Sequence, residues 1–538
     1  MNRLFKITLL SLVLVIPIAS CDTDELHNRN INPQALNTVP MEFLFTAAQL
    51  SSASGGSGGD NRYIDWRTNI GFCAYAIQQL ANSTNAGISP GDKYFDNVES
   101  YNAPWEFIYG DQLKNLTEVL KQTGEGGFDT GKDNLRNAAR ILRAFNFHRL
   151  TDYYGDIPYS DALKGLDLNF LPTYDNQQTI YLDLLNELDE ASAALTPLVS
   201  TNPSDKTFKE ADLFFGDLGY AEVIPKWKKF GYSLMLRLAM RISNVDAANA
   251  NKYVQKAIAG GVFESNADNV WVPMAESPSQ WTNQNGISRA FLSGDGGQPT
   301  TLSKRLVDEL KGAAGTADDD PRLMIFSGGL NGNTDPNVQR GLPNGLDQTM
   351  VDALEGHTGV NVSTTFSQLN TKLIQVDDPY LLMGYPEVAF LLAEAGERGI
   401  GGVSAGDAEQ NYNDGVRAAI QTWVAFDQTF AVADVTVDGY LAARPYPLAG
   451  TLNQKLEAIG NQMWLSKFMN WWDAWADWRR TGHPTLTPVV YPGNVTGGTI
   501  PRKLRIPNAE IATNQANYAD GATTPDTALG RVWWDGGN

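Results

Sequence analysis

Hydrophobic residues recur along much of the chain at intervals of three and four positions. Trp227, Phe230, Leu234, Leu238 and Ile242 form such a stripe, and the lysines and arginines of the same segment fall outside it. This spacing is typical of an amphipathic helix with one buried face. Comparable stripes occur in residues 104–122, 132–150, 178–195, 384–397, 407–424 and 453–480. The sequence therefore predicts a mainly α-helical protein with little β-structure.

Residues that flank these stripes predict several helix ends. Asp175 followed by Gln178 resembles a capping box, and Gly482 followed by Pro484 predicts that a helix stops after Arg480. Long segments rich in Gly, Pro, Asn and Thr separate the helices, at residues 51–62, 83–103, 264–300, 312–380 and 484–538. Loops of this length in a compact domain are usually functional, so we expect them to carry ligand contacts.

The N-terminus has the features of a lipoprotein signal peptide. A positively charged start and an apolar run over residues 7–19 precede the small residues Ala19 and Ser20 and then Cys21. A lipoprotein signal peptidase requires small side chains at the scissile bond and a thiol that carries the lipid. We therefore predict lipidation of Cys21. The alternatives are an ordinary secretory signal cleaved elsewhere and a single membrane anchor, although the apolar run is shorter than the ~20 residues of a spanning helix.

This interpretation divides the chain into a signal peptide (residues 1–20), a lipidated tether (21–40) and a helical binding domain (41–538). An acidic cluster follows the predicted anchor, at Asp22, Asp24 and Glu25. In lipoproteins of the Bacteroidota type, acidic residues after the cysteine resemble a signal for export to the outer face of the outer membrane. A solvated linker is the other interpretation of this cluster.

Charge and cysteine content narrow the possible functions. The formal net charge is −20, and no basic stretch interrupts the acidic body, so nucleic acid is excluded as a partner because its phosphates would be repelled. With Cys21 assigned to lipid, Cys73 has no partner within the chain. The protein must therefore depend on a packed core rather than on disulfides.

Several short motifs resemble one family when they are taken in order along the chain. They are Asn32-Pro33, Val39-Pro40, Tyr154-Gly155-Asp156-Ile157-Pro158-Tyr159, Lys226-Trp227, Tyr385-Pro386-Glu387-Val388, Trp475-Ala476-Asp477-Trp478-Arg479-Arg480-Thr481-Gly482 and Ile506-Pro507. In this order the chain resembles the SusD/RagB family of nutrient-binding lipoproteins, in particular the subfamily with the Trp-Arg-Arg-Thr-Gly segment. Leu504-Arg505-Ile506 departs from that subfamily, which more often has an arginine and a tyrosine before the proline.

The resemblance implies a scaffold of tetratricopeptide-like helix pairs with long ligand-binding loops. It also implies a partner, a SusC-like TonB-dependent outer-membrane transporter, to which the protein delivers captured oligosaccharides. Such proteins are binders rather than enzymes. A peptide ligand within the same uptake system is the alternative, and a surface glycoside hydrolase is a further one.

The sequence contains no motif that predicts catalysis or a cofactor. The four histidines have no metal-ligand spacing, and the Gly-x-Ser-x-Gly strings at residues 55–59 and 402–406 do not follow a predicted strand, as a nucleophile elbow requires. Asp318-Asp319-Asp320 lacks the alternating ligands and glycine turn of a calcium loop, so we expect a solvated turn or helix cap there. A glycosidase would need two carboxylates at a defined separation, which sequence alone does not reveal.

Aromatic and amide side chains in the predicted loops are the candidate ligand contacts. An aromatic ring stacks on the C–H face of a sugar while amides bond its hydroxyls, so the Trp/Asn/Gln segment near residue 281 suits a neutral glycan. The tryptophans at 464, 471, 472, 475 and 478 follow a helical face and are expected in the core. The candidate ligand-binding residues are Trp281, Asn283, Asn285, Trp66, Tyr94 and Tyr101.

Overall fold

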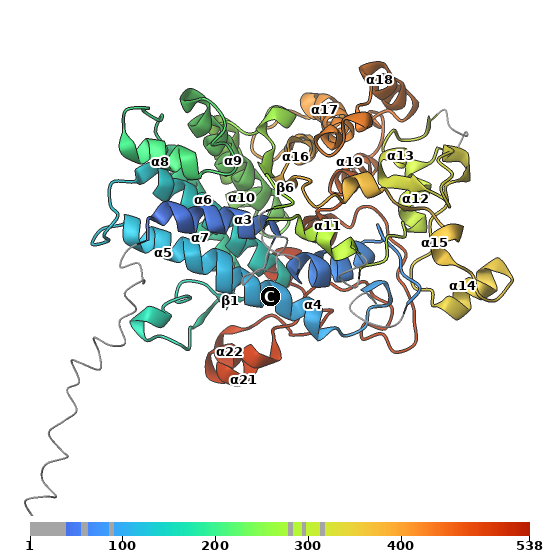
Figure 1. The fold of residues 1–538 in the computed structure, drawn as a ribbon, viewed down its shortest axis with the longest axis horizontal. Coiled ribbons are helices and arrows are strands. Elements are labelled where there is room, and N and C mark those ends of the chain that lie inside the picture. The colour runs from blue at the N-terminus through green and yellow to red at the C-terminus, as the bar shows by residue number, and fades with distance from the viewer. Residues whose placement is uncertain are drawn as a thin grey trace, which may run out of the picture. The chain divides into compact units, whose positions relative to one another are not determined.

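The computed structural model describes residues 39–54, 63–84, 91–277, 283–292, 297–312 and 318–537. The chain divides into two compact units, Met1–Pro40 and Met41–Asn538. All helices and strands of the described residues belong to the second unit (Figure 1). Cys21 and the rest of the predicted signal peptide lie outside the described residues.

Consecutive helices of the second unit pack on each other in pairs. The pairs are α6 (Asp133–Tyr154) with α7 (Gln177–Ala194), α9 (Tyr220–Arg241) with α10 (Ala247–Gly260), and α16 (Tyr385–Arg398) with α17 (Ala408–Gln421). α7 also packs on α9, and α19 (Leu452–Ser466) packs on both α16 and α20 (Trp471–Thr481). This stacking of helix pairs confirms the predicted mainly helical, tetratricopeptide-like scaffold.

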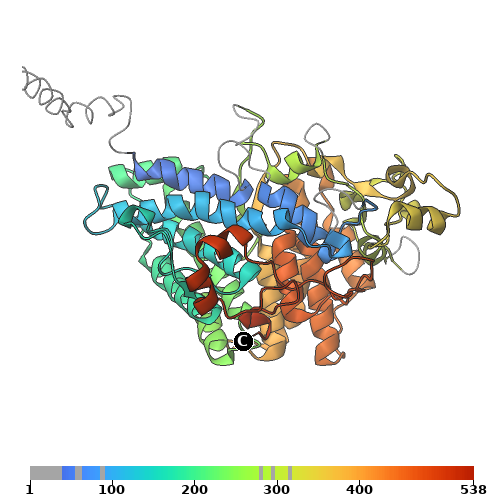
Figure 2. The same ribbon diagram turned by 90° about the horizontal axis from the view of Figure 1, so that it is seen from below.

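The N-terminal helices form a further layer. Figure 2 shows the blue helices along one side of the stacked pairs. They are α3 (Met41–Ser54), the π-helix η2 (Asp65–Ala74), α4 (Val98–Phe107), the π-helix η4 (Ile108–Leu113) and α5 (Lys114–Thr123). α3 packs on α5 and α6, and η2 packs on α4 and α20. The predicted stripe over 104–122 is therefore real, with a π-helical turn in its middle.

The remaining helices are short, and the strands are shorter still. The helices are α8 (Pro203–Ala211), α11 (Gly286–Phe291), α12 (Lys304–Leu310), α13 (Leu323–Phe326), α14 (Gln348–Glu355), α15 (Val362–Thr365), α18 (Asp434–Ala443), α21 (Asn508–Thr513) and α22 (Gln515–Gly521). The strands pair antiparallel as β1 (Ile157–Pro158) with β2 (Tyr174–Asp175), β3 (Val270–Val272) with β6 (Tyr380–Met383), and β4 (Ser327–Gly329) with β5 (Gln368–Leu369).

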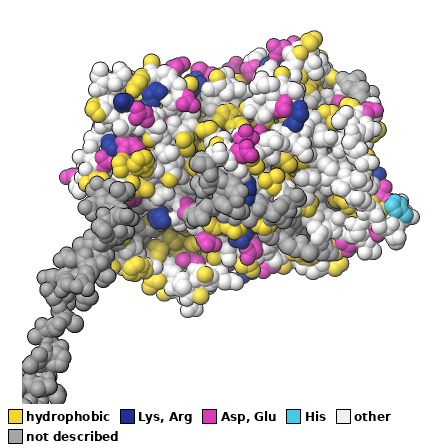
Figure 3. Space-filling model, viewed as in Figure 1, with side chains coloured by type: hydrophobic (Ala, Val, Ile, Leu, Met, Phe, Trp, Pro, Cys, Tyr) yellow, Lys and Arg dark blue, Asp and Glu magenta, His cyan; other side chains and the backbone are white. Residues whose placement is uncertain are grey.

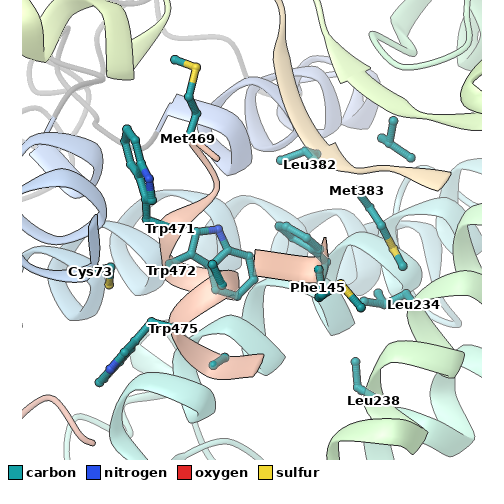
Figure 4. Close-up of a cluster of buried hydrophobic side chains, with 14 of the residues drawn as sticks. Cys73, Phe145, Leu234, Leu238, Leu382, Met383, Met469, Trp471, Trp472 and Trp475 are labelled. Atoms are coloured by element: carbon teal, nitrogen blue, oxygen red, sulfur yellow. The ribbon is translucent and has the colours of Figure 1, made fainter. Parts of the chain in front are cut away.

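One large hydrophobic core connects these layers, and α20 lies within it. All five tryptophans of residues 464–478 are buried, which confirms their predicted place in the core. Figure 4 shows Trp471, Trp472 and Trp475 pointing from α20 toward different neighbours, with Cys73 and Phe145 close by. Phe145 of α6 meets Trp472 edge to face at 6.1 Å between centroids. Trp472 thus joins α20 to α6 of the stacked pairs.

Two predicted helix boundaries differ from the structure, and a third is confirmed. The stripe over 453–480 is two helices, because residues 467–470 separate α19 from α20 and Met469 has a left-handed φ of 73°. The cap of α7 is Asn176, whose side chain accepts a hydrogen bond from Thr179 N, while Asp175 belongs to β2. Gly482 ends α20 in the left-handed conformation, as its sequence predicts.

A membrane-spanning segment is also absent from the part of the chain that the structure describes. None of its helices is both long enough and apolar enough to cross a bilayer.

Candidate functional site

An aromatic row lies where η2 meets α4, and we define it as Tyr63, Trp66 and Phe107. The Tyr63 ring lies nearly parallel to that of Trp66, at 13° and 6.4 Å between centroids. It is also nearly parallel to Phe107, at 16° and 5.4 Å. All three side chains are half-buried. Tyr63 therefore orients the Trp66 indole.

A pair of opposite charges borders the aromatic row. The Arg67 guanidinium lies 4.2 Å from the centroid of the Tyr63 ring, and Arg67 Nη1 lies 2.9 Å from Glu99 Oε2. Glu99 is half exposed, so the pair is in contact with solvent. Phe107, Arg67 and Glu99 are not among the residues predicted from the sequence, because only the packing of α4 on η2 brings Phe107 to Tyr63 and Glu99 to Arg67.

The turn that carries Trp66 is fixed by the buried carboxyl group of Asp65. Tyr380 Oη donates a hydrogen bond to Asp65 Oδ1 at 2.9 Å, and Asn69 Nδ2 donates to the same oxygen at 3.1 Å. Burial raises the pKa of Asp65 to about 7, against the opposing effects of Arg149 and these hydrogen bonds. π-Helical turns are often found at functional sites. Here the π-helix points Asp65 into the core and leaves Trp66 nearer the surface.

Tyr94 and Tyr101, predicted as ligand contacts, are both buried. Tyr94 Oη accepts a hydrogen bond from Val489 N at 3.3 Å, and burial raises the pKa of Tyr94 to about 12. The carbonyl of Tyr101 accepts from Tyr154 Oη at 2.6 Å, and the guanidinium of Arg505 lies 5.5 Å from the Tyr101 ring. Tyr94 therefore supports the loop before α4 from inside, and Tyr101 supports the first turns of α4.

Asn285 is buried and forms the N-terminal cap of α11. Its side-chain oxygen accepts from Ile287 N at 3.0 Å and from Ser288 N at 3.2 Å, and its Nδ2 donates to the Asp378 carbonyl at 3.0 Å. Since α11 packs on η2, Asn285 sits at the end of a helix that supports the Trp66 turn.

Asn283 and Trp66 have further backbone contacts near this turn. Asn283 is half-buried, and its carbonyl accepts from Ala275 N at 2.8 Å. Gln298 Nε2 donates to the Trp66 carbonyl at 3.1 Å. Trp281, also predicted as a contact, lies outside the described residues. The elements that carry Trp66 and Asn285 thus pack on each other, η2 on α11, whereas Tyr94 lies beneath a separate groove.

That groove has a volume of about 470 Å³ and lies between α12 and the C-terminal segment. Its walls include Lys304, Arg305, Asp308 and the hydrophobic Met350 and Val489. Among the described residues that line it, none is aromatic. The groove therefore lacks a stacking surface for sugar rings, which the aromatic row provides.

The buried core contains one cluster of acidic groups close enough together to hold a metal ion, among the residues described. It consists of Glu387, Asp473 and Asp477. Lys467 Nζ already pairs with all three, at 3.3 Å from Glu387 and 2.6 Å from Asp473 and in closer contact with Asp477. Arg241 Nη2 adds a second cation 2.7 Å from Asp473. The cluster is therefore an internally neutralised ion network, and a divalent cation would be repelled by the lysine.

Asp320 is not solvated, in contrast to the solvated turn or helix cap predicted for residues 318–320. It is fully buried, and its carboxylate accepts hydrogen bonds from Arg322 Nε at 2.9 Å and Nη2 at 2.6 Å. Arg322 Nη2 also donates to Gln462 Oε1 at 2.6 Å. Asp320 thus holds Arg322, which contacts Gln462 of α19. The local sequence of the acidic run does not reveal this arrangement.

Comparisons with known proteins agree with this architecture. Residues 33–507 match the SusD-like family described as "Starch-binding associating with outer membrane". A solved structure named as a chitin-binding protein is 31% identical, with a TM-score of 0.75, and the match covers 92% of this chain and 99% of that one. No similar sequence is found among curated proteins.

Two further solved structures share the fold at lower identity. A SusD homolog from Bacteroides uniformis is 24% identical, with a TM-score of 0.71 and coverage of 93% and 100% of the two chains. A chitin-binding SusD homolog from Flavobacterium johnsoniae is 23% identical, with a TM-score of 0.70 and coverage of 92% and 98%. The collinear motifs, the stacked helix pairs and the family match over residues 33–507 together show that this chain belongs to the SusD-like family.

Proposed function

We propose that this protein is a cell-surface lipoprotein that captures a neutral oligosaccharide and delivers it to a SusC-like TonB-dependent transporter. The observation that carries the proposal is the aromatic row of Tyr63, Trp66 and Phe107. An indole held in a fixed orientation can stack on the C–H face of a sugar without first losing conformational freedom. Trp66, the indole of the row, is the ring that fits this role.

Charge favours an uncharged ligand. The chain has a formal net charge of −20, which repels acidic polysaccharides at long range. Beside the aromatic row, Arg67 and Glu99 compensate each other's charge. The guanidinium group of Arg67 can also donate hydrogen bonds to sugar hydroxyls, and the carboxylate of Glu99 can accept them. The names of two similar structures point the same way, because both are chitin-binding and chitin is an uncharged polymer.

The predicted contact residues take different roles in this proposal. Trp66, Trp281 and Asn283 remain proposed ligand contacts. Asn285, Tyr94 and Tyr101 are proposed as supporting residues, because all three side chains are buried and the side-chain polar groups of Asn285 and Tyr94 bond within the protein. The long loops thus contribute both direct contacts and the walls that hold them.

Anchoring at Cys21 and partnership with a transporter complete the proposal. The Ile18-Ala19-Ser20-Cys21 segment supports the lipid anchor, and the family description supports association with the outer membrane. The protein binds and transfers its ligand without catalysing a reaction on it. In gently solubilised outer membranes we expect a TonB-dependent barrel to co-purify with it. Recovery as a lone monomer, with no such barrel encoded beside its gene, would contradict the delivery role.

Calorimetry with a panel of neutral oligosaccharides and peptides tests the ligand class. We expect binding to a neutral glycan and none to peptides of similar length. Tight peptide binding without glycan binding would favour the alternative function, a peptide-binding lipoprotein. Release of shortened oligosaccharides during the titration would instead indicate a glycoside hydrolase.

A further inference from the structure

The segment between β1 and β2 exposes an unusual number of large hydrophobic side chains. Within six positions, Leu166 is 82% exposed, Leu168 80%, Phe170 71% and Leu171 56%. We call these four residues the apolar loop; in Figure 1 it lies in the teal segment beside the β1 label. Single exposed hydrophobic residues are common on protein surfaces, but a contiguous group of this kind usually marks an interaction surface.

The backbone of this segment is held in a defined conformation. Asp161 accepts hydrogen bonds from Asn169 Nδ2 at 2.7 Å and from Lys164 Nζ at 3.1 Å. At the far end, Asn517 Nδ2 donates to the Leu171 carbonyl at 2.8 Å. Leu168 has a left-handed φ of 63°, which is unfavourable for a leucine and persists only where surrounding contacts impose it. The polar groups are thus bonded inward, and the hydrophobic side chains face outward.

A cavity of about 320 Å³ lies behind the apolar loop, between it, α5 and α6. Leu120, Leu163, Leu166 and Phe147 are among its lining residues. Two lysines, Lys121 and Lys164, also line it, and each is almost half exposed. Lys121 pairs with Asp167 at 3.3 Å and Lys164 with Asp161 at 3.1 Å, so the charges around the apolar loop are compensated.

The attachment of the tether lies at the same end of α5. Met41 begins α3, and its N–H donates to Asp129 Oδ2 at 3.2 Å, in the turn that follows α5. Lys121, which contacts the segment of the apolar loop, is in the last turn of α5. Two more exposed rings stand next to this contact in the sequence, Phe43 and Phe128. Met41, where the second unit begins, and the contact of Lys121 with the apolar loop segment therefore both lie near the C-terminal end of α5.

We propose that the apolar loop inserts into the interfacial region of the lipid bilayer that carries the Cys21 anchor. This inference rests on the anchoring part of the proposed function. Cys21 is 20 residues from Met41. A tether of that length spans at most about 70 Å when extended and roughly 25 Å as a flexible coil. Because the tether keeps the loop near the bilayer, the bilayer is the apolar phase that the loop meets at the highest effective concentration.

Leucine and phenylalanine side chains flanked by lysines are the composition of segments that bind at membrane interfaces. The diacylglyceryl group of a lipoprotein supplies two acyl chains, and the loop contact would add buried apolar area to that attachment. It would also restrict the orientation of the body, since the loop adds a second fixed point to the tether. The contact requires no anionic headgroup, because the neighbouring lysines are already paired with aspartates.

The test uses the full mature lipidated protein in vesicles of phosphatidylethanolamine and phosphatidylglycerol. An environment-sensitive fluorophore is attached at Leu168→Cys, which is selective because Cys73 is buried. The matched control is Val435→Cys, equally exposed but on α18, at the opposite side of Figure 1. We expect emission at position 168 to rise about twofold or more and to be quenched by lipids with nitroxide-labelled acyl chains, with neither effect at position 435. Phe170→Asp with Leu171→Asp should abolish the effect at position 168.

The following results would overturn the inference. Absence of quenching at position 168, or equal quenching at both positions, would show that the loop does not insert specifically into the bilayer. A signal that depends on protein density at fixed lipid would indicate contact with a second copy. A signal that requires the transporter would indicate contact with a protein partner. Glycan affinity, measured on the same samples, reports on the aromatic row independently of the loop. Absence of acyl chains on the Cys21 peptide by mass spectrometry would refute both the anchor and this inference while leaving glycan binding unaffected.

Discussion

Arg237 of α9 and Glu387 of α16 form a buried bidentate ion pair. Arg237 Nε donates to Glu387 Oε1 and Arg237 Nη2 to Glu387 Oε2, each at 2.6 Å. Arg237 Nη2 also lies 3.3 Å from Asp473 of α20. These contacts therefore connect three helices that are far apart in the sequence.

Removing both partners of this pair should cost less stability than the sum of the two single removals. Arg237→Met leaves Glu387 with less compensation in a buried environment, and we expect a loss of about 3–5 kcal/mol in the free energy of unfolding. The double variant with Glu387→Met should be less destabilised than the sum of the single variants. Arg340→Met, which breaks the exposed pair with Glu355, is the control and should cost about 1 kcal/mol or less. Urea unfolding of the four variants measures these differences.

Trp475→Ala should destabilise the protein without a direct effect on ligand contact. The indole is fully buried, its Nε1 donates to the Pro501 carbonyl at 3.0 Å, and Phe72 meets it edge to face at 5.2 Å. We expect a loss of about 3–5 kcal/mol in the free energy of unfolding. Val490→Ala, at a highly exposed position, should change it by about 0.5 kcal/mol or less. Equal melting temperatures for the two variants would contradict the assignment of Trp475 to the core.

Acid should weaken the fold partly through His148. Burial lowers the pKa of His148 to about 4, although Asp152 opposes the shift. The unfolded chain binds a proton near the ordinary value of 6.5, whereas the folded chain does not until about pH 4. The contribution of His148 to stability is therefore complete above pH 6.5 and is lost as the pH falls toward 4, by at most about 1.4 kcal/mol per pH unit.

Comparison of the wild type with His148→Gln isolates this contribution from other titrating groups. The variant is expected to be less stable at pH 7, but the gap between the two proteins should narrow as the pH falls from 6.5 to 4. Urea unfolding at half-unit pH steps provides the measurement. A gap that stays constant across this window would mean that His148 titrates alike in the folded and unfolded chains.

The amphipathic stripes predicted most of the helical scaffold, because helix formation depends on spacing that is visible locally. The break between α19 and α20 was not predicted, since Lys467 leaves the helical stripe to neutralise Asp473 and Glu387, residues of other segments. Only Trp66 of the aromatic row was predicted as a contact. Phe107 was not predicted, because it joins the row from a different helix by stacking on Tyr63. Asn285 has the composition of a sugar contact, yet in the fold its amide caps α11.

Cys21→Ala should change where the protein is found in the cell. Without a thiol to carry lipid, we expect the protein to be recovered in the soluble or periplasmic fraction rather than with the outer membrane. Protease added to intact cells should cleave the wild type and spare the variant. A wild type that resists the protease on intact cells and is recovered by periplasmic extraction would contradict surface display.

The proposed function requires that Trp66 of the aromatic row contacts a neutral glycan. Calorimetric titration of an oligosaccharide that binds the wild type should be repeated with Trp66→Ala and, separately, with Trp281→Ala, alongside thermal melts. We predict that each substitution weakens binding by on the order of 1 kcal/mol or more, that is, about fivefold or more in Kd, with little change in melting temperature. Unchanged glycan affinity in Trp66→Ala, in a protein that melts like the wild type, would contradict the claim.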